Sequence, residues 1–304
     1  MSEIQSHGRL PVAPNSPVLR INMPVRDILL QIDTYPDATP TEALDQAVRF
    51  TAAVGGVLSA LAVEVDIQAP KNPLADYLIG LSQMALEEEQ KSRRFCAAAL
   101  EAFASRAGEA GVLGEVIHGK ADLYAVGAYV AERSRTRDLC IVPVVDQFDG
   151  QRSVVEAVVF GSGRPVLTFR PGVADLPVGG LGTIVLAWDG SRTAARAMAD
   201  ALPVMQTARE VRVLTVTNEK PSAHSGVGTE VARHLAAHGV NAVVEEVDAG
   251  GRRIGMVLEE SLAEHRPDLL VMGAYGRSRA REFILGGATE HMLRNPKVPL
   301  LLSH

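Results

Sequence analysis

The most informative stretch of this chain is Asp268-Leu-Leu-Val-Met-Gly-Ala-Tyr-Gly276, followed after nine residues by Gly286-Gly287. Residues 269–272 are uncharged and mostly aliphatic, which is typical of a buried strand in a parallel sheet. Glycines directly after a strand leave backbone amides accessible, and a helix predicted over 288–294 adds the positive end of its dipole. The stretch therefore predicts an anion site at a strand end. The alternative is that the glycines serve only as turn and cap residues.

A second strand end in the same half carries polar residues. The run Thr183-Ile-Val-Leu-Ala-Trp-Asp189-Gly190-Ser191 predicts a strand that ends in an acid, before a helix over 192–202. Ligands of open parallel sheets bind outside the carboxyl ends of strands, where the winding direction reverses. Asp189 is therefore a candidate to accept hydrogen bonds from ribose hydroxyls. Its alternative role is to cap the helix together with Ser191.

An internal repeat organises the chain. Three pairs of segments correspond between the halves: 26–33 with 182–189, 138–142 with 268–272, and 164–169 with 298–302. The second half then alternates helices and strands, predicted at 192–202 (helix), 210–216 (strand), 229–238 (helix), 242–248 (strand) and 253–265 (helix). This alternation predicts right-handed parallel crossovers. We expect an α/β protein with two tandem doubly wound, Rossmann-like parallel-sheet domains.

The domain boundaries follow from composition. Glycine and proline cluster without periodicity over 170–180, as in a linker. We therefore expect an N-terminal arm at 1–23, a first domain at 24–170 and a second domain at 181–304. The first domain carries an extra segment over 66–91 with a glutamate-rich helical end.

Four motifs in the second half resemble the universal stress protein family. They are A-W-D-G-S (187–191), V-M-G-A-Y-G-R-S-R (271–279), I-L-G-G-A-T-E-H-M-L (284–293) and V-P-L-L-L (298–302). Nucleotide-binding members of that family carry G-x2-G-x9-G followed by Ser or Thr. Gly273, Gly276 and Gly286 match the glycines at this spacing, whereas Gly287 replaces the hydroxyl residue. Thr289 could supply a hydroxyl instead, or be an ordinary residue of the first helical turn.

The resemblance implies a site for an adenine nucleotide, ATP or else ADP or AMP. Asp189 would hold the ribose or the adenine edge, and Ala187 and Val216 would contact the adenine. The phosphates would receive backbone amides from the segment that holds Gly273, Gly276, Gly286, Gly287 and Ala288. Arg277 would add charge, unless it is a solvent-facing loop residue. The family also implies Mg²⁺ with ATP, which would rest mainly on phosphate oxygens and water, because Glu282 is the only acid between the motif glycines. We expect no metal site made of protein ligands.

The first half has lost the glycine motif. Counted from the preceding strand, Pro143 and Asp146 stand where Gly273 and Gly276 stand. Counted from the last strand, Arg152 and Ser153 stand opposite Gly286 and Gly287, and the loop is four residues shorter. Acidic side chains in such a loop would repel phosphate. We therefore expect one nucleotide site per chain, in the second half, and a degenerate first domain.

Composition excludes several classes of function. A net charge of -6 and a pI near 5.8 give no basic footprint for nucleic acid. No apolar run approaches the ~20 residues of a membrane span, and residues 1–23 do not have the pattern of a secretory signal. Cys96 and Cys140 are expected to be buried thiols of a reducing cytoplasm, with a disulfide or metal pair as the alternative.

The sequence favours a binding protein over an enzyme. It contains no G-x4-G-K-[ST] loop, and Ser191 and His291 stand without an evident catalytic partner, so we expect no catalytic residue and leave slow hydrolysis open. Three hypotheses remain: a nucleotide-binding stress regulator, a nucleotide-free interaction or scaffold protein, and an enzyme or flavin-type carrier by analogy of fold alone. The family pairs domains through their last strands, so 166–169 and 299–302 are expected to meet as an intrachain pseudo-dimer. A homodimer and an unidentified protein partner are left open.

Overall fold

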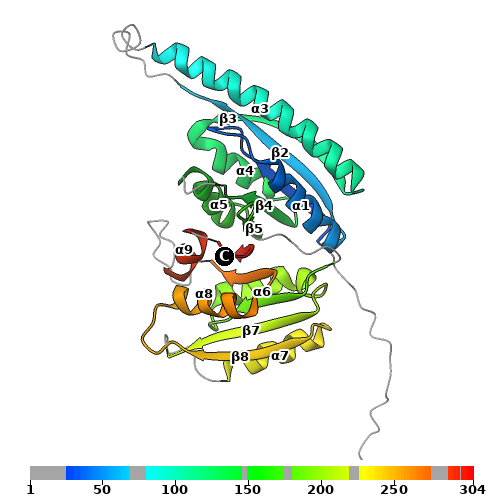
Figure 1. The fold of residues 1–304 in the computed structure, drawn as a ribbon, viewed down its shortest axis with the longest axis vertical. Helices are drawn as coiled ribbons and strands as arrows, with labels where there is room; N and C mark the ends of the chain where they lie inside the picture. Colours follow the sequence, from blue (N-terminus) through cyan, green and yellow to red (C-terminus); the bar gives the residue numbers. More distant parts are fainter. Residues whose placement is uncertain are drawn as a thin grey trace, which may run out of the picture.

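The computed structural model describes residues 25–68, 80–145, 149–173, 180–218, 226–274, 287–294 and 296–304. Within them, a single sheet runs through both halves in the order β3-β2-β1-β4-β5-β10-β9-β6-β7-β8 (Figure 1). Its strands are β1 (Asp27–Ile32), β2 (Val57–Asp66), β3 (Leu113–Asp122), β4 (Leu139–Pro143), β5 (Val166–Phe169), β6 (Thr183–Ala187), β7 (Glu210–Thr217), β8 (Ala242–Asp248), β9 (Leu269–Gly273) and β10 (Leu300–Ser303).

The two halves repeat one strand order, 3-2-1-4-5 in the first and 8-7-6-9-10 in the second. The strands within each half pair parallel, as the alternation of strands and helices predicted. The α/β fold class, with two doubly wound units in tandem, is therefore confirmed. In each unit the winding reverses beside the first strand, between β1 and β4 and between β6 and β9.

The halves join through their last strands. β5 and β10 pair antiparallel, with Leu167 opposite Leu301 and Thr168 opposite Leu300. Leu167, Leu300 and Leu301 are each at most 1% exposed. This pairing makes one continuous sheet, so neither of these strands presents an open edge. Figure 1 shows β5 and the C-terminus together at the junction of the two halves.

Helices cover both faces of the sheet. They are α1 (Thr41–Val54), α3 (Leu81–Glu109), α4 (Val126–Ser134), α5 (Asp149–Gly161), α6 (Arg192–Met205), α7 (Val227–Ala237), α8 (Ile254–His265) and α9 (Gly287–Arg294), with a 3₁₀ turn at Leu123–Ala125. One apolar core lies under α1, α3, α6 and α7 and contains the fully buried Phe50 and Phe103. The other lies under α4, α5, α8 and α9. Buried apolar strands between two helical layers are expected of parallel sheets.

The helix bounds follow local chemistry. α6 begins where Ser191 caps it, since the Ser191 Oγ accepts a hydrogen bond from the amide of Ala194 at 3.1 Å. It continues to Met205, three residues beyond the predicted end, with Pro203 in its last turn. The glutamate-rich end of the predicted extra segment lies in the N-terminal part of α3, a helix of 29 residues, whereas residues 69–79 of that segment lie outside the described residues.

Both cysteines are free and buried, as expected. Burial raises the pKa of the Cys96 thiol to about 11 and that of Cys140 to about 12. Neither thiol is therefore activated as a nucleophile. In the described part of the chain, no helix combines the length and apolar character needed to cross a membrane.

Candidate functional site

The candidate site lies at the carboxyl ends of β6 and β9, which are neighbours in the sheet. Ala187, the last residue of β6, stands opposite Met272 of β9. β6 leads into α6 on one face of the sheet, whereas the chain after β9 leads to α9 on the other face. The two connections therefore diverge at the point where the winding reverses, which is where ligands of open α/β sheets bind.

Asp189 and Ser191 shape the loop after β6. The Asp189 Oδ1 accepts a hydrogen bond from the amide of Ser191 at 3.0 Å, and Asp189 makes a further interaction besides. The cap of α6 is Ser191, whose hydroxyl also lies 3.1 Å from the hydroxyl of Thr193. The role of helix cap, which was the alternative for Asp189 together with Ser191, is thus filled by Ser191. Asp189 holds the loop in an Asx turn at the mouth of the strand.

Gly273 is required by the protein's own packing. A Cβ atom at this position would lie 2.5 Å from the carbonyl carbon of Thr193 and 2.6 Å from the amide nitrogen of Ala194. The first turn of α6 therefore contacts the end of β9, and a side chain at 273 would separate them. The sequence predicted an exposed amide here, and the structure adds a steric reason for glycine that is independent of any ligand.

Gly287 has the opposite surroundings. It is exposed at the start of α9, and a Cβ atom added to it would find no other atom within 4 Å. Ala288 is partly buried against the core under α8 and α9, and Thr289 is 3% exposed. The start of α9 thus presents backbone next to open space, which suits an anion at a helix N-terminus.

The predicted adenine contacts lie on one face of the sheet. Ala187 and Val216 both pack in the core under α8 and α9, and Val216 is 8% exposed. Val216 lies on β7, the strand next to β6, and pairs with Val247 of β8. The structure therefore brings Ala187, Val216, Asp189 and Gly273 to the carboxyl ends of three adjacent strands. Gly276, Arg277 and Gly286 lie outside the described residues.

Two histidines border this region. The His291 Nε2 of α9 lies 3.0 Å from the Glu259 Oε2 of α8, and the His291 ring packs on Gly255, where a Cβ would be 2.5 Å from the ring. The His304 Nδ1 lies 3.0 Å from the carbonyl oxygen of Ala274, the residue that follows β9. Its ring also contacts Phe160 of α5 at 4.9 Å between centroids. These contacts could not be predicted from sequence periodicity, because each joins elements that are distant along the chain.

In the first half, the side chains of Gln31 and Gln151 lie at the position that corresponds to the strand ends of the candidate site. Asp33, which corresponds to Asp189, accepts a hydrogen bond from the Gln31 Nε2 at 2.6 Å. Burial raises the pKa of Asp33 to about 6 against the smaller effects of hydrogen bonds from Gln31 and Gln151. Gln151, on α5, also accepts the amide of Val145 at 2.6 Å.

Arg152 replaces the third motif glycine in the first half. Its guanidinium pairs with Glu156 on its own helix at 3.1 Å and with Glu290 of α9 at 3.6 Å. Arg294 and Arg152 together hold the pKa of Glu290 below its usual value, mainly through the hydrogen bond from Arg294. The loss of the motif in the first half therefore coincides with an ion pair that joins α5 to α9.

The comparison with protein families agrees with this geometry. The sequence model of the universal stress protein family matches residues 180–304. Residues 180–304 form a universal stress protein domain. The fold of the whole chain resembles a universal stress protein from Archaeoglobus fulgidus DSM 4304, with a TM-score of 0.61 and 19% identity over 90% of this chain and 95% of that one.

A second solved structure shows the same architecture. This structure is that of a protein from Pseudomonas aeruginosa UCBPP-PA14 that is assigned to the universal stress proteins. It has a TM-score of 0.51 and 16% identity over 92% of this chain and 93% of that one. At these identities the two structures establish the fold alone. The search of curated proteins gave no match to the sequence. The universal stress protein domain thus accounts for the second half, and its fold recurs in the first.

Proposed function

We propose that the universal stress protein domain binds an adenine nucleotide, ATP or else ADP or AMP, at the carboxyl ends of β6 and β9. The observation that carries the proposal is the convergence of Ala187, Asp189 and Gly273 at the point where the winding reverses. These residues lie close together in the fold, because the sheet register places Ala187 of β6 directly opposite Met272 of β9, and Gly273 follows Met272.

Each residue of this set has chemistry that suits the nucleotide. The partly buried Ala187 and the apolar Val216 offer surface to an adenine ring, and the Asp189 carboxylate can accept hydrogen bonds from ribose hydroxyls. Open space at the Cβ position of Gly287 allows phosphate oxygens to approach the amides that begin α9. Gly276, Gly286 and Arg277 complete the phosphate site in this proposal. Any Mg²⁺ would be held by phosphate oxygens and water.

The proposed role is regulation through binding, without turnover. The nucleotide would rest on the first turn of α9, and α9 is joined to α8 by His291 and Glu259 and to α5 of the first half by Glu290 and Arg152. Occupancy of the site would therefore act on contacts between the halves. Such contacts suit a protein whose nucleotide state alters its association with a second copy or with another protein in the cytoplasm.

The experiment that tests the proposal identifies what the purified protein carries. Small molecules released by denaturation are identified by mass, and ATP is titrated into the native protein by calorimetry. We expect an adenine nucleotide in the released fraction or saturable binding of added ATP. If no adenine nucleotide is released and no heat appears at millimolar ATP, the nucleotide-free interaction protein is the function that remains; the missing hydroxyl at Gly287 is the observation that favours it.

A pair of variants locates the site. Gly276→Asp places a negative charge in the glycine motif and should abolish binding. Gly150→Asp is the matched control, because Gly150 lies in the first turn of α5 and a Cβ there meets no atom within 4 Å. The control should bind ATP as the parent does. Equal affinity in the Gly276→Asp variant would show that the glycine loop is not the site.

A further inference from the structure

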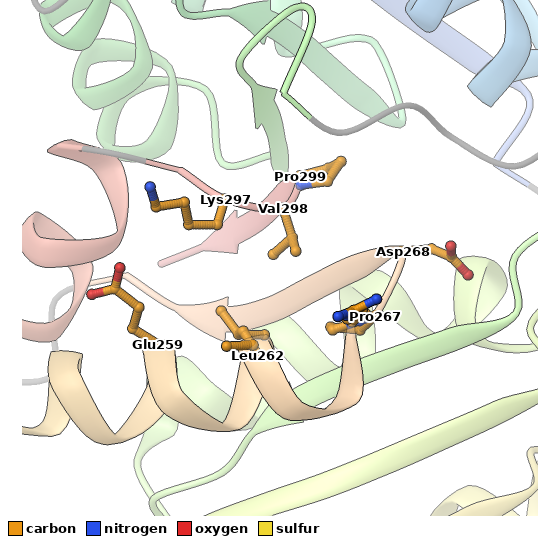
Figure 2. A pocket seen from close by; sticks show the side chains of 9 residues that line it. Glu259, Leu262, Pro267, Asp268, Lys297, Val298 and Pro299 are labelled. Carbon is orange, nitrogen blue, oxygen red and sulfur yellow. The ribbon is translucent and has the colours of Figure 1, made fainter.

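A pocket of about 550 Å³ lies at the other end of the second half, away from the glycine motif. Figure 2 shows it between α8 and the segment that leads into β10, at the amino ends of β9 and β10. Its walls include apolar groups from three segments, namely Leu262 and Ala263 of α8, Pro267 before β9, and Val298 and Pro299 before β10. This volume falls within the range of small-molecule sites.

The two acids that line the pocket are already engaged. The Asp268 Oδ2 accepts hydrogen bonds from the amides of Gly182 and Thr183 at 2.6 and 3.0 Å. Glu259 pairs with His291 of α9 at 3.0 Å. Both carboxylates therefore have hydrogen-bond partners that lie outside the pocket.

The two cations that line the pocket are not engaged in this way. Arg266 and Lys297 are both exposed, and within the described ranges neither side chain makes a hydrogen bond or ion pair. They approach the pocket from different elements, Arg266 from the end of α8 and Lys297 from the segment before β10. Figure 2 shows Lys297 above α8, with its ammonium group on the side of Glu259.

The backbone of Arg266 is strained. Its φ is 45°, in the left-handed region, and its amide closes α8 by donating to the carbonyl of Leu262 at 2.9 Å. Glycine is the usual residue at such a helix end, and a side chain there costs about 1 kcal/mol. Strained residues of this kind concentrate at binding sites. Arg266 thus stands at a position whose backbone conformation favours glycine.

In the first half, hydrogen bonds from arginine side chains to backbone carbonyls occupy the position that corresponds to this pocket. Gly163 stands where Lys297 stands, and the next residue, Arg164, donates from its Nε to the carbonyl of Arg135 at 3.1 Å. Arg135 in turn donates to the carbonyl of Gly161 at 3.2 Å. These contacts join the end of α4 to the segment before β5. In the second half, Arg266 and Lys297 make no such contacts with the described residues.

We propose that this pocket binds a small organic carboxylate with an apolar body. The body would lie on Leu262, Pro267 and Val298, and the carboxylate would pair with Lys297 and Arg266. Charge-assisted hydrogen bonds to a carboxylate are the interaction that both free cations can offer. The pocket is separate from the nucleotide site, so the inference does not depend on the proposed function.

The test uses 4-phenylbutyrate as the probe, with its neutral amide, 4-phenylbutanamide, as the matched ligand. The full chain, labelled with ¹⁵N, is titrated with each compound, and amide shifts are followed by NMR. We expect saturable shifts at Ala263, Asp268 and Lys297 with the acid, and affinity weaker by about tenfold for the neutral amide. Equal affinity for the two compounds, or no saturable shift at tens of millimolar acid, would overturn the proposal.

Three variants separate recognition from folding. Lys297→Gln and Arg266→Gly each should weaken binding of the acid by about tenfold and leave binding of the neutral amide unchanged. Arg266→Gly also relieves the left-handed strain, so it should not unfold the protein. Arg233→Gln removes an exposed cation of α7 as the control for net charge and should bind the acid as the parent does. Acid binding that survives both pocket substitutions together would place the ligand elsewhere.

Discussion

Asp268 fixes the start of β6 from the neighbouring strand, because its Oδ2 accepts the amide of Thr183 at 3.0 Å and that of Gly182 at 2.6 Å. The first half repeats this arrangement. The Asp138 Oδ2 accepts the amides of Arg26 and Asp27 at 2.9 and 3.0 Å. In both halves an acid before the fourth strand thus satisfies the donors that begin the first strand.

Asp268→Ala should lower the free energy of unfolding by about 2 kcal/mol, since it removes two charge-assisted hydrogen bonds from partly buried donors. Asp138→Ala is the matched variant, and it should cost about 1 kcal/mol because its hydrogen bonds are exposed to water. Urea unfolding measures both. A larger loss for Asp138→Ala would contradict this ranking.

Gly273→Ala should destabilise the protein by about 2 kcal/mol, because the added Cβ would overlap the backbone of Thr193 and Ala194. Gly287→Ala serves as the control, since its Cβ would enter open space and should change stability by less than about 0.5 kcal/mol. Thermal unfolding of the two variants without nucleotide tests the contrast. Equal stability of both would mean that α6 moves away from β9 at little cost.

Gly287→Ser should strengthen ATP binding by about fivefold, if the proposed function holds. It restores the hydroxyl that the family motif carries, at a site with room for the side chain, and a hydrogen bond is worth about 1 kcal/mol. Calorimetric titration with ATP measures the change, and Gly287→Ala is the control that adds a Cβ without a hydroxyl. Tighter binding by both variants would assign the gain to the helix and not to the hydroxyl.

Gly255 and His291 should show strong energetic coupling. Gly255→Ala alone should cost about 2 kcal/mol, because its Cβ would lie 2.5 Å from the imidazole. In a His291→Gly background the same substitution should cost much less, because the three nearest atoms that the added Cβ would meet, Cγ, Cβ and Cδ2, all belong to the His291 side chain. A double-mutant cycle from denaturant unfolding gives the coupling. Additive losses would show that α8 and α9 do not contact each other through this pair.

The sequence predicted the secondary structure well where short apolar runs are flanked by charged residues. The strand expected at 242–248 is Ala242–Asp248, and the helix expected at 253–265 is Ile254–His265. The parallel pairing within each half also followed, because strands that alternate with helices are joined by parallel crossovers. The end of α6 was placed three residues early, since the helix continues through Pro203 to Met205.

The candidate site was readable only in part. Ala187, Asp189 and Gly273 share one edge of the sheet because parallel strands end together. The steric demand of Thr193 on Gly273, the ion pair of Arg152 with Glu290 and the contact of His304 with Ala274 depend on tertiary packing between distant segments. No local pattern in the sequence encodes such contacts. The predicted roles of Gly276, Arg277 and Gly286 stay predictions.

The buried carboxyl of Asp33 should make stability depend on pH. Its pKa is raised to about 6 in the folded protein, from an ordinary value of 3.8, because burial disfavours the charged form. The folded state therefore binds the extra proton between about pH 4 and 6, so this contribution to stability is present below pH 4 and is lost as the pH rises through 6.

Asp33→Asn removes that ionisation and should raise the free energy of unfolding at pH 7 by about 2 kcal/mol, with little change at pH 4. Asp37→Asn, at an exposed acid of the same loop, controls for net charge and should show no such dependence. Urea unfolding at a series of pH values measures the difference between each variant and the parent. A gain for Asp33→Asn that is the same at pH 4 and pH 7 would show that the carboxyl does not titrate in the fold.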